Sequence, residues 1–132
     1  MRDFVKDDAY LKNALVLAYL GDAVFSLLTR DWLVKSFNYK PNQLNKMCNS
    51  IVCAKNQAKI MVELKNELAE EELDIVMRAR NTHLSNNKAK NSTIEEYNLA
   101  TQFEAVVGFW YLTGQTEKIN NMFTNFVKNK IQ

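Results

Sequence analysis

Apolar residues recur every three or four positions along most of this chain, which is the spacing of one face of an α-helix. The segments that predict helices cover residues 10–35, 41–68, 69–81, 92–112 and 116–130. The first segment has room for a bend at Gly21, and the second fits either one long helix or two short ones. Three glycines and one proline leave little material for the turns of a β-sheet. We therefore predict an all-α fold, a single-domain helical bundle over residues 1–132.

Polar residues mark the helix boundaries in the second half of the chain. Ser92 or Thr93, followed by Glu95 or Glu96, has the pattern of a capping box and predicts the start of a long helix. The stretch 81–92 before it is rich in Asn and Lys and predicts a loop. In the short helix that precedes this loop, the residues expected to face the core are Leu73, Val76 and Met77.

The size and charge of the chain limit its partners. A domain of 132 residues has an unfavourable surface-to-volume ratio, so a further buried interface would help it and we expect an oligomer. The aromatic run from Phe109 to Tyr111 predicts core packing and a subunit interface. Seventeen basic and fifteen acidic residues give a net charge of +2, which is too balanced for a bulk polyelectrolyte binder. Any attraction to nucleic acid must come from local clusters of basic residues.

The cysteines and the hydropathy pattern predict a cytoplasmic protein. Cys48 and Cys53 lie five positions apart on a predicted helix, which fits neither a disulfide framework nor a zinc site. We expect both thiols to be reduced. No apolar run reaches the roughly 18 residues of a membrane span, and the N-terminus has no apolar leader segment. We therefore expect no membrane partner.

Two strongly apolar segments each contain a single charged residue. Asp22 is the only charge between residues 14 and 28, and Glu104 is the only charge between residues 99 and 112. An ionised carboxylate is costly to bury, so such a group protonates, pairs with a base or binds a metal. Neither segment contains a Lys, Arg or His that could act as a local partner. The alternative is that each acid lies at the edge of its apolar face and reaches water or a lysine of another helix.

Small residues surround both acids and favour a close approach of their helices. They are Ala18, Gly21, Ala100, Ala105 and Gly108. A close approach would bring Asp22 and Glu104 to one site, and two carboxylates without a base predict a cation. Hard oxygen ligands suit Mg²⁺ or Mn²⁺, ions that assist phosphodiester hydrolysis. We predict that these two acids are the catalytic and metal-binding residues.

A basic segment, residues 78–92, follows the acidic residues 70–74. It contains no acid, and its one histidine, His83, has no second histidine to form a metal site with it. Spaced cations with Asn and Ser donors can contact a phosphate backbone, whereas the alternative is a solvated loop. The residues predicted to contact RNA are Arg78, Arg80, Asn81, Lys88 and Lys90.

Two motifs of the chain resemble the acidic motifs of the ribonuclease III catalytic domain. They are LAYLGDAVF at residues 17–25 and FEAVVGFWYL at residues 103–112. The segments KPNQLN, CAKNQA and RARN follow the order of the Mini-III branch of this family, although the family more often has glycine where Ala79 stands. The resemblance implies that Asp22 and Glu104 are metal ligands at the cleavage site.

The sequence departs from fuller members of the family at two positions. Those enzymes have a further acid where this chain has Ala18 and another where it has Thr101, departures that resemble the Mini-III branch itself. Two protein carboxylates then remain, and water and RNA phosphate would complete the metal shell. The printed sequence ends after its last predicted helix, so we expect no double-stranded-RNA-binding domain and a catalytic domain that grips its own substrate.

The resemblance implies a Mg²⁺-dependent endoribonuclease, with Mn²⁺ as a substitute, that cuts double-stranded RNA as a homodimer. Each subunit's site would cut one strand, and the implied substrate is a stem of the large-subunit ribosomal RNA precursor. Whether a ribosomal protein assists stays open. One alternative is a non-catalytic helical RNA-binding or ribosome-assembly module with the same fold. A purely structural helical protein is the other.

Overall fold

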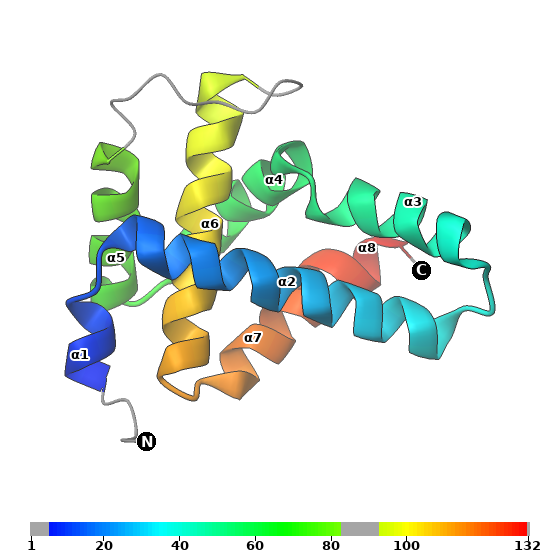
Figure 1. The fold of residues 1–132 in the computed structure, drawn as a ribbon. Coiled ribbons are helices and arrows are strands. Elements are labelled where there is room, and N and C mark those ends of the chain that lie inside the picture. The colour runs from blue at the N-terminus through cyan, green and yellow to red at the C-terminus, as the bar shows by residue number, and fades with distance from the viewer. Residues whose placement is uncertain (1–5, 83–92, 132) are drawn as a thin grey trace.

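The computed structural model of the protein describes residues 6–82 and 93–131, and the elements in these ranges are helical (Figure 1). Their order is α1 (Lys6–Tyr10), α2 (Ala14–Ser36), α3 (Pro41–Val52), α4 (Ala54–Leu64), the 3₁₀ turn η1 (Lys65–Glu67), α5 (Glu70–Asn81), α6 (Ile94–Leu112), α7 (Thr116–Phe123), the π-helical turn η2 (Thr124–Lys128) and α8 (Asn129–Ile131). The prediction of an all-α fold is confirmed. His83, Lys88 and Lys90 lie outside the described residues, as does most of the predicted loop.

The helix boundaries follow local capping chemistry. The first predicted helix begins at Ala14 and not at Tyr10, because the Asn13 side chain accepts a hydrogen bond from the Leu15 N–H at 2.8 Å and starts α2. Helix α2 then runs unbroken through Gly21. In the second segment the two-helix alternative is right, with Cys53 as the joint between α3 and α4. The capping box is confirmed at Thr93, whose hydroxyl accepts from the Glu96 N–H at 3.0 Å.

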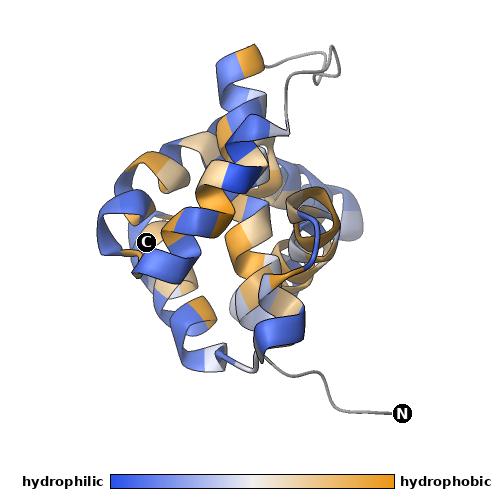
Figure 2. Cartoon of the chain, turned by 90° about the vertical axis from the view of Figure 1, so that its left-hand side faces the viewer, coloured by the Kyte–Doolittle hydropathy of each residue, from blue (hydrophilic) through white to orange (hydrophobic). Residues whose placement is uncertain are grey.

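Helix α6 forms the centre of the molecule. It packs against α2, α4 and α5, and Figure 1 shows α2 lying across it. Phe25 of α2 and Phe103 of α6 meet edge to face in the core, with ring centroids 4.9 Å apart. Figure 2 shows hydrophobic and hydrophilic residues on different sides of the same helices. One shared core therefore holds the helices that carry the two acids.

Two glycines allow α2 and α6 to touch backbone to backbone. A Cβ atom added at Gly21 would collide with the carbonyl oxygen of Glu104, and one added at Gly108 would collide with the carbonyl oxygen of Leu17. Side chains at these positions would hold the helices apart. The predicted close approach is confirmed, and it places Asp22, next to Gly21, beside Glu104.

The inner face of α5 differs from the prediction. Val76 is buried as expected and Leu73 is half-buried, but Met77 is 45% exposed and Glu72 takes an inner position. A carboxylate can lie there because other elements satisfy it. The Trp110 Nε1–H and the Lys118 ammonium donate to it at 2.6 Å each, and the Ala69 N–H at 2.8 Å.

Other expectations concern the cysteines, the aromatic run and the membrane. Cys48 is buried, Cys53 is exposed and neither forms a disulfide, which confirms the prediction of free thiols. Phe109 and Trp110 are core residues, whereas Tyr111 is exposed. Among the described helices, none is both long enough and apolar enough to cross a bilayer.

Candidate active site

Asp22 and Glu104 face one hollow at the crossing of α2 and α6. The hollow has a volume of about 240 Å³ and is lined by Leu15, Ala18, Tyr19, Asp22, Tyr97, Thr101 and Glu104. Asp22 is exposed and Glu104 is half-buried. The structure therefore brings the two predicted site residues together, and one side of the pair is open to solvent.

A third helix contributes a polar side chain that sequence reasoning missed. Gln57 of α4 is only 2% exposed, and its Nε2 lies 3.5 Å from Oε2 of Glu104. A signal for it exists in the sequence, because Gln57 occupies the same face of α4 as the buried Ile60, Met61 and Leu64. A glutamine at an apolar position of a helix predicts a buried polar partner on another element.

The surroundings of Glu104 disfavour its charged form. Burial, a hydrogen bond with Asp22 and the charge of Asp22 raise the pKa of Glu104 to about 9, and the amide of Gln57 opposes the rise. Within residues 6–82 and 93–131, no Lys, Arg or His forms an ion pair with either acid. Without a cation, the pair therefore holds a proton at neutral pH, and a bound cation would replace that proton.

The donor set fits a hard cation that keeps several water ligands. Two carboxylates supply anionic oxygen atoms, and the open side of the hollow leaves positions for water or phosphate oxygens. In the part of the chain that the structure describes, no cluster of three or more His, Cys, Asp or Glu residues is placed to hold a metal ion. Thr101 also lines the hollow, but its hydroxyl donates to the carbonyl oxygen of Tyr97 at 3.0 Å. Mg²⁺ and Mn²⁺ suit such a site, whereas an all-protein cage for Ca²⁺ does not.

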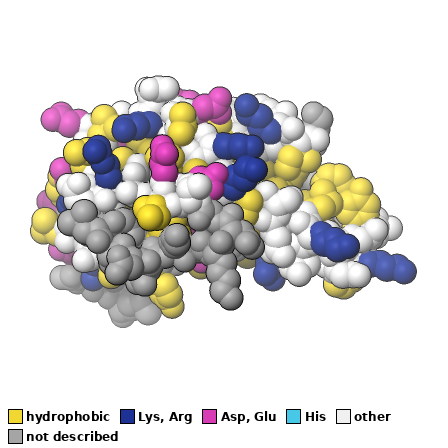
Figure 3. Space-filling view, turned by 90° about the horizontal axis from the view of Figure 1, so that it is seen from above, with side chains coloured by type: hydrophobic (Ala, Val, Ile, Leu, Met, Phe, Trp, Pro, Cys, Tyr) yellow, Lys and Arg dark blue, Asp and Glu magenta, His cyan; other side chains and the backbone are white. Residues whose placement is uncertain are grey.

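Of the predicted RNA-binding residues, the structure describes Arg78, Arg80 and Asn81, which lie on α5. Arg78 makes internal contacts that tie the N-terminal segment to α5: its guanidinium donates to the carbonyl oxygens of Tyr10 at 2.6 Å and Lys12 at 3.2 Å and lies 3.2 Å from Asp74. Arg80 and Asn81 are exposed at the end of α5. In the described part of the face seen in Figure 3, basic, acidic and apolar side chains are interspersed. The RNA-binding role of these residues stays a prediction.

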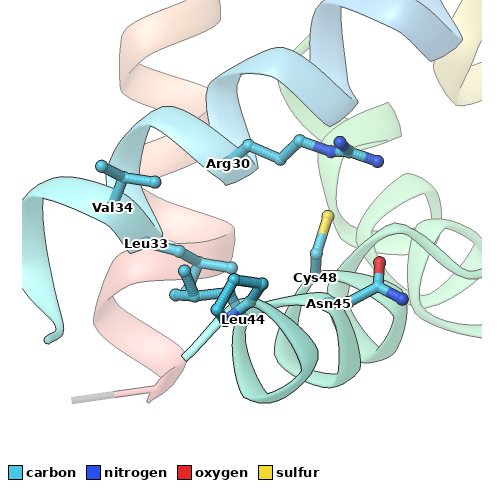
Figure 4. A pocket seen from close by; sticks show the side chains of 7 residues that line it. Arg30, Leu33, Val34, Leu44, Asn45 and Cys48 are labelled. Carbon is cyan, nitrogen blue, oxygen red and sulfur yellow. The ribbon is translucent and has the colours of Figure 1, made fainter. Parts of the chain in front are cut away.

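A separate pocket of about 230 Å³ lies between the end of α2 and α3 (Figure 4). Its walls combine the apolar side chains of Leu33, Val34 and Leu44 with Arg30 and Asn45. Neither acid of the α2–α6 crossing lines it. The pocket is therefore distinct from the carboxylate site.

Comparison with known proteins decides the family of this chain. The family model described as the Ribonuclease III domain matches residues 15–115. The chain belongs to the ribonuclease III family. It is 47% identical over 112 residues to Mini-ribonuclease 3 of Brevibacillus brevis, a match that covers 85% of this chain and 83% of that one. It is 37% identical over 119 residues to Mini-ribonuclease 3 of Staphylococcus aureus, covering 89% and 88%.

A solved structure supports the same conclusion for the fold. The X-ray structure of protein FN1578 from Fusobacterium nucleatum superposes with a TM-score of 0.84 at 33% identity, covering 92% of this chain and 96% of that one. The predicted resemblance to the Mini-III branch of the ribonuclease III family is confirmed by these matches. Both acids and both glycines of the helix crossing lie within the matched residues 15–115.

Proposed function

We propose that this protein is a Mg²⁺- or Mn²⁺-dependent endoribonuclease that hydrolyses double-stranded RNA in the cytoplasm. The observation that carries the proposal is the pair Asp22 and Glu104 at an open hollow on the α2–α6 crossing, in a chain of the ribonuclease III family. Relatives named Mini-ribonuclease 3 support the choice of RNA as substrate. The proposed substrate is a stem of the large-subunit ribosomal RNA precursor.

Asp22 and Glu104 would hold the cation between α2 and α6. When bound, the ion supplies an activated water and stabilises the leaving 3′-oxygen, which leaves 5′-phosphate and 3′-hydroxyl ends. Glu104 must release its proton before it can act as an anionic ligand, so burial keeps this carboxyl protonated until a cation arrives. Asp22 is the more exposed of the two acids, so an incoming phosphate would meet it first. The rigid backbone contact at Gly21 and Gly108 fixes the spacing of the two side chains.

A second copy of the chain is the proposed partner, and the exposed face of α2 is the proposed interface. One side of this helix carries the exposed apolar residues Val16, Leu27 and Val34. The side chain of Leu27 is 69% exposed. Tyr19, 84% exposed, lies on the same helix and also lines the carboxylate hollow. An apolar groove of about 300 Å³ adjoins Leu27. An apolar surface of this kind marks an interaction site, and here it would place the subunit interface beside the catalytic acids.

The proposed RNA contacts remain Arg78, Arg80, Asn81, Lys88 and Lys90. Arg80 and Asn81 are exposed at the end of α5, and the charge of the residues that follow supports phosphate contact. The hydrogen bonds of Arg78 to the N-terminal segment hold α5 in place, and this helix carries Arg80 and Asn81. A-form RNA is recognised mainly through its shape, phosphates and 2′-hydroxyl groups, so such contacts would add affinity without reading sequence.

A cleavage assay on duplex RNA tests the proposal. We expect the purified protein to cut the duplex with Mg²⁺, to stop when EDTA is added, and to leave a single-stranded control of the same sequence largely intact. Binding of the duplex without cutting would instead favour the non-catalytic RNA-binding or assembly module, which a site of only two described carboxylates allows. Cleavage that continues in EDTA would contradict the metal-dependent mechanism.

A further inference from the structure

Gln57 is a buried polar side chain with a defined orientation. It lies on α4, whose buried Ile60 and Met61 pack in the core. The corner before it is fixed by Asn56, whose Nδ2 donates to the carbonyl oxygen of Ile51 at 2.7 Å and so joins the end of α3 to the start of α4. The position of the Gln57 side chain is therefore set by helix packing.

The amide of Gln57 faces a carboxylate of the proposed site. A buried amide is costly unless it is hydrogen-bonded. Among the described residues, Glu104 is the side chain to which Gln57 donates, from Nε2 to Oε2 at 3.5 Å. This distance is longer than the usual optimum of about 2.9 Å, so the contact is weak in the cation-free site. It would shorten as Glu104 becomes charged, because hydrogen bonds to an ionised acceptor are shorter and stronger.

A neutral donor suits a cation site better than a basic side chain would. A lysine at this position would pair with Glu104 and repel a divalent ion. An amide instead stabilises the carboxylate by one hydrogen bond and leaves its negative charge available. Asp22, the other polar neighbour, has the opposite effect because it repels a charged Glu104.

We infer that Gln57 is a positioning residue, whose amide orients the Glu104 carboxylate toward the site shared with Asp22. This inference rests on the proposed function, since it assigns Glu104 to a cation. It adds α4 to the two helices that carry the acids. The site is then built at the meeting point of three helices.

Binding of Mn²⁺ to the RNA-free protein tests the inference, with free Mn²⁺ followed by electron paramagnetic resonance. Gln57→Met removes the amide at similar length, and Gln102→Met is the matched control. Gln102 is also a buried glutamine, 4% exposed, but it donates to Asn98 of its own helix at 3.2 Å. We expect Gln57→Met to raise the Kd for Mn²⁺ about three- to tenfold, and Gln102→Met to leave it unchanged.

Further readouts separate positioning from a general loss of structure. Thermal unfolding should be affected similarly in the two variants, and duplex cleavage by Gln57→Met should recover at saturating Mn²⁺, because the KM for the ion changes more than kcat. The shorter Gln57→Asn keeps an amide that cannot span the gap, so it should also weaken Mn²⁺ binding.

Two negative results have different meanings. In the first, the wild-type protein binds Mn²⁺ and Asp22→Asn weakens this binding, but folded Gln57→Met or Gln57→Asn binds Mn²⁺ as tightly as the wild type. This result overturns the inference about Gln57 and leaves the proposed function standing. If the wild-type protein binds no Mn²⁺, the inference is overturned, and the proposed function fails with it when the ion also supports no cleavage of duplex RNA.

Discussion

Glu72 and Glu104 both lie against apolar helices, yet their pKa values move in opposite directions. Burial raises the pKa of each carboxyl. For Glu72, hydrogen bonds from Lys118, Trp110 and the Ala69 N–H outweigh burial and hold its pKa below the usual range. For Glu104, burial and Asp22 act in the same direction, and among the described residues the opposing group is Gln57. Glu72 is thus a satisfied structural anion, whereas Glu104 has what a cation-binding acid needs.

The raised pKa of Glu104 predicts how the stability of the cation-free protein depends on pH. A glutamate with an ordinary pKa of 4.5 loses its proton in the unfolded chain, while Glu104 in the fold holds its proton up to about pH 9. Stability linked to this group is therefore complete below about pH 4.5 and is lost progressively as the pH rises from there through about 9. Glu104→Gln cannot ionise, so it should be more stable than the wild type at neutral pH and similar to it in acid.

Thermal unfolding in EDTA across this pH range measures the effect. Glu117→Gln, which changes an exposed acid of α7, serves as the control and should keep the wild-type dependence on pH. A Glu104→Gln variant whose difference in melting temperature from the wild type is the same at every pH would contradict the raised pKa.

At the scale of the helices, the α2–α6 crossing sets the site. Gly108→Ala forces a methyl group against the carbonyl oxygen of Leu17, so the helices must separate. We expect a loss of about 2 kcal/mol or more in the free energy of unfolding, as for other overpacked positions, together with weaker Mn²⁺ binding. Chemical denaturation measures the first effect.

Gly114→Ala is an instructive comparison. A Cβ atom there meets open space, but the backbone has a φ of 70°, so a cost of about 1–2 kcal/mol arises from conformation alone. Because Gly114 lies outside the helix crossing, this variant should keep wild-type Mn²⁺ binding. Equal Mn²⁺ affinities for the two variants would show that the close approach does not position the acids.

Local patterns predicted much of this architecture. Helical periodicity and the Thr93 capping box marked the elements, and the isolation of Asp22 and Glu104 in apolar segments marked the acids. The glycines near them indicated the close approach. These features depend on residues near one another in the sequence, so they can be recognised without the fold.

Features that depend on distant partners were missed. Gln57 contacts an acid that lies 47 positions away, and Glu72 is buried only because Trp110 and Lys118 come from later helices. A polar residue at an apolar position of a helix predicts burial, but the sequence does not identify its partner.

At the scale of the whole molecule, the proposed dimer face makes a direct prediction. Leu27→Asp places a charge in the apolar face of α2 and should convert a dimer to a monomer, as measured by light scattering after size exclusion. Val62→Asp is the matched control, because Val62 is similarly exposed but lies on α4. The proposed interface would be wrong if Leu27→Asp stayed dimeric, or if the wild type were already monomeric.

RNA binding is a second property of the whole molecule. Changing Lys88 and Lys90 together to Ala should weaken duplex binding and reduce the slope of log Kd against log salt by about 1.8, since each phosphate contact contributes about 0.9. Fluorescence anisotropy at several salt concentrations measures this slope. An unaltered slope would move the RNA contact to another surface.

The central claim is that Asp22 and Glu104 hold the cation with which this chain cuts RNA. The most direct test is single-turnover cleavage of duplex RNA by Asp22→Asn and the wild type at saturating Mg²⁺, with duplex affinity measured in parallel. We predict that Asp22→Asn cleaves at least about 100-fold more slowly while it folds and binds the duplex as the wild type does. Cleavage by Asp22→Asn at the wild-type rate would contradict the claim.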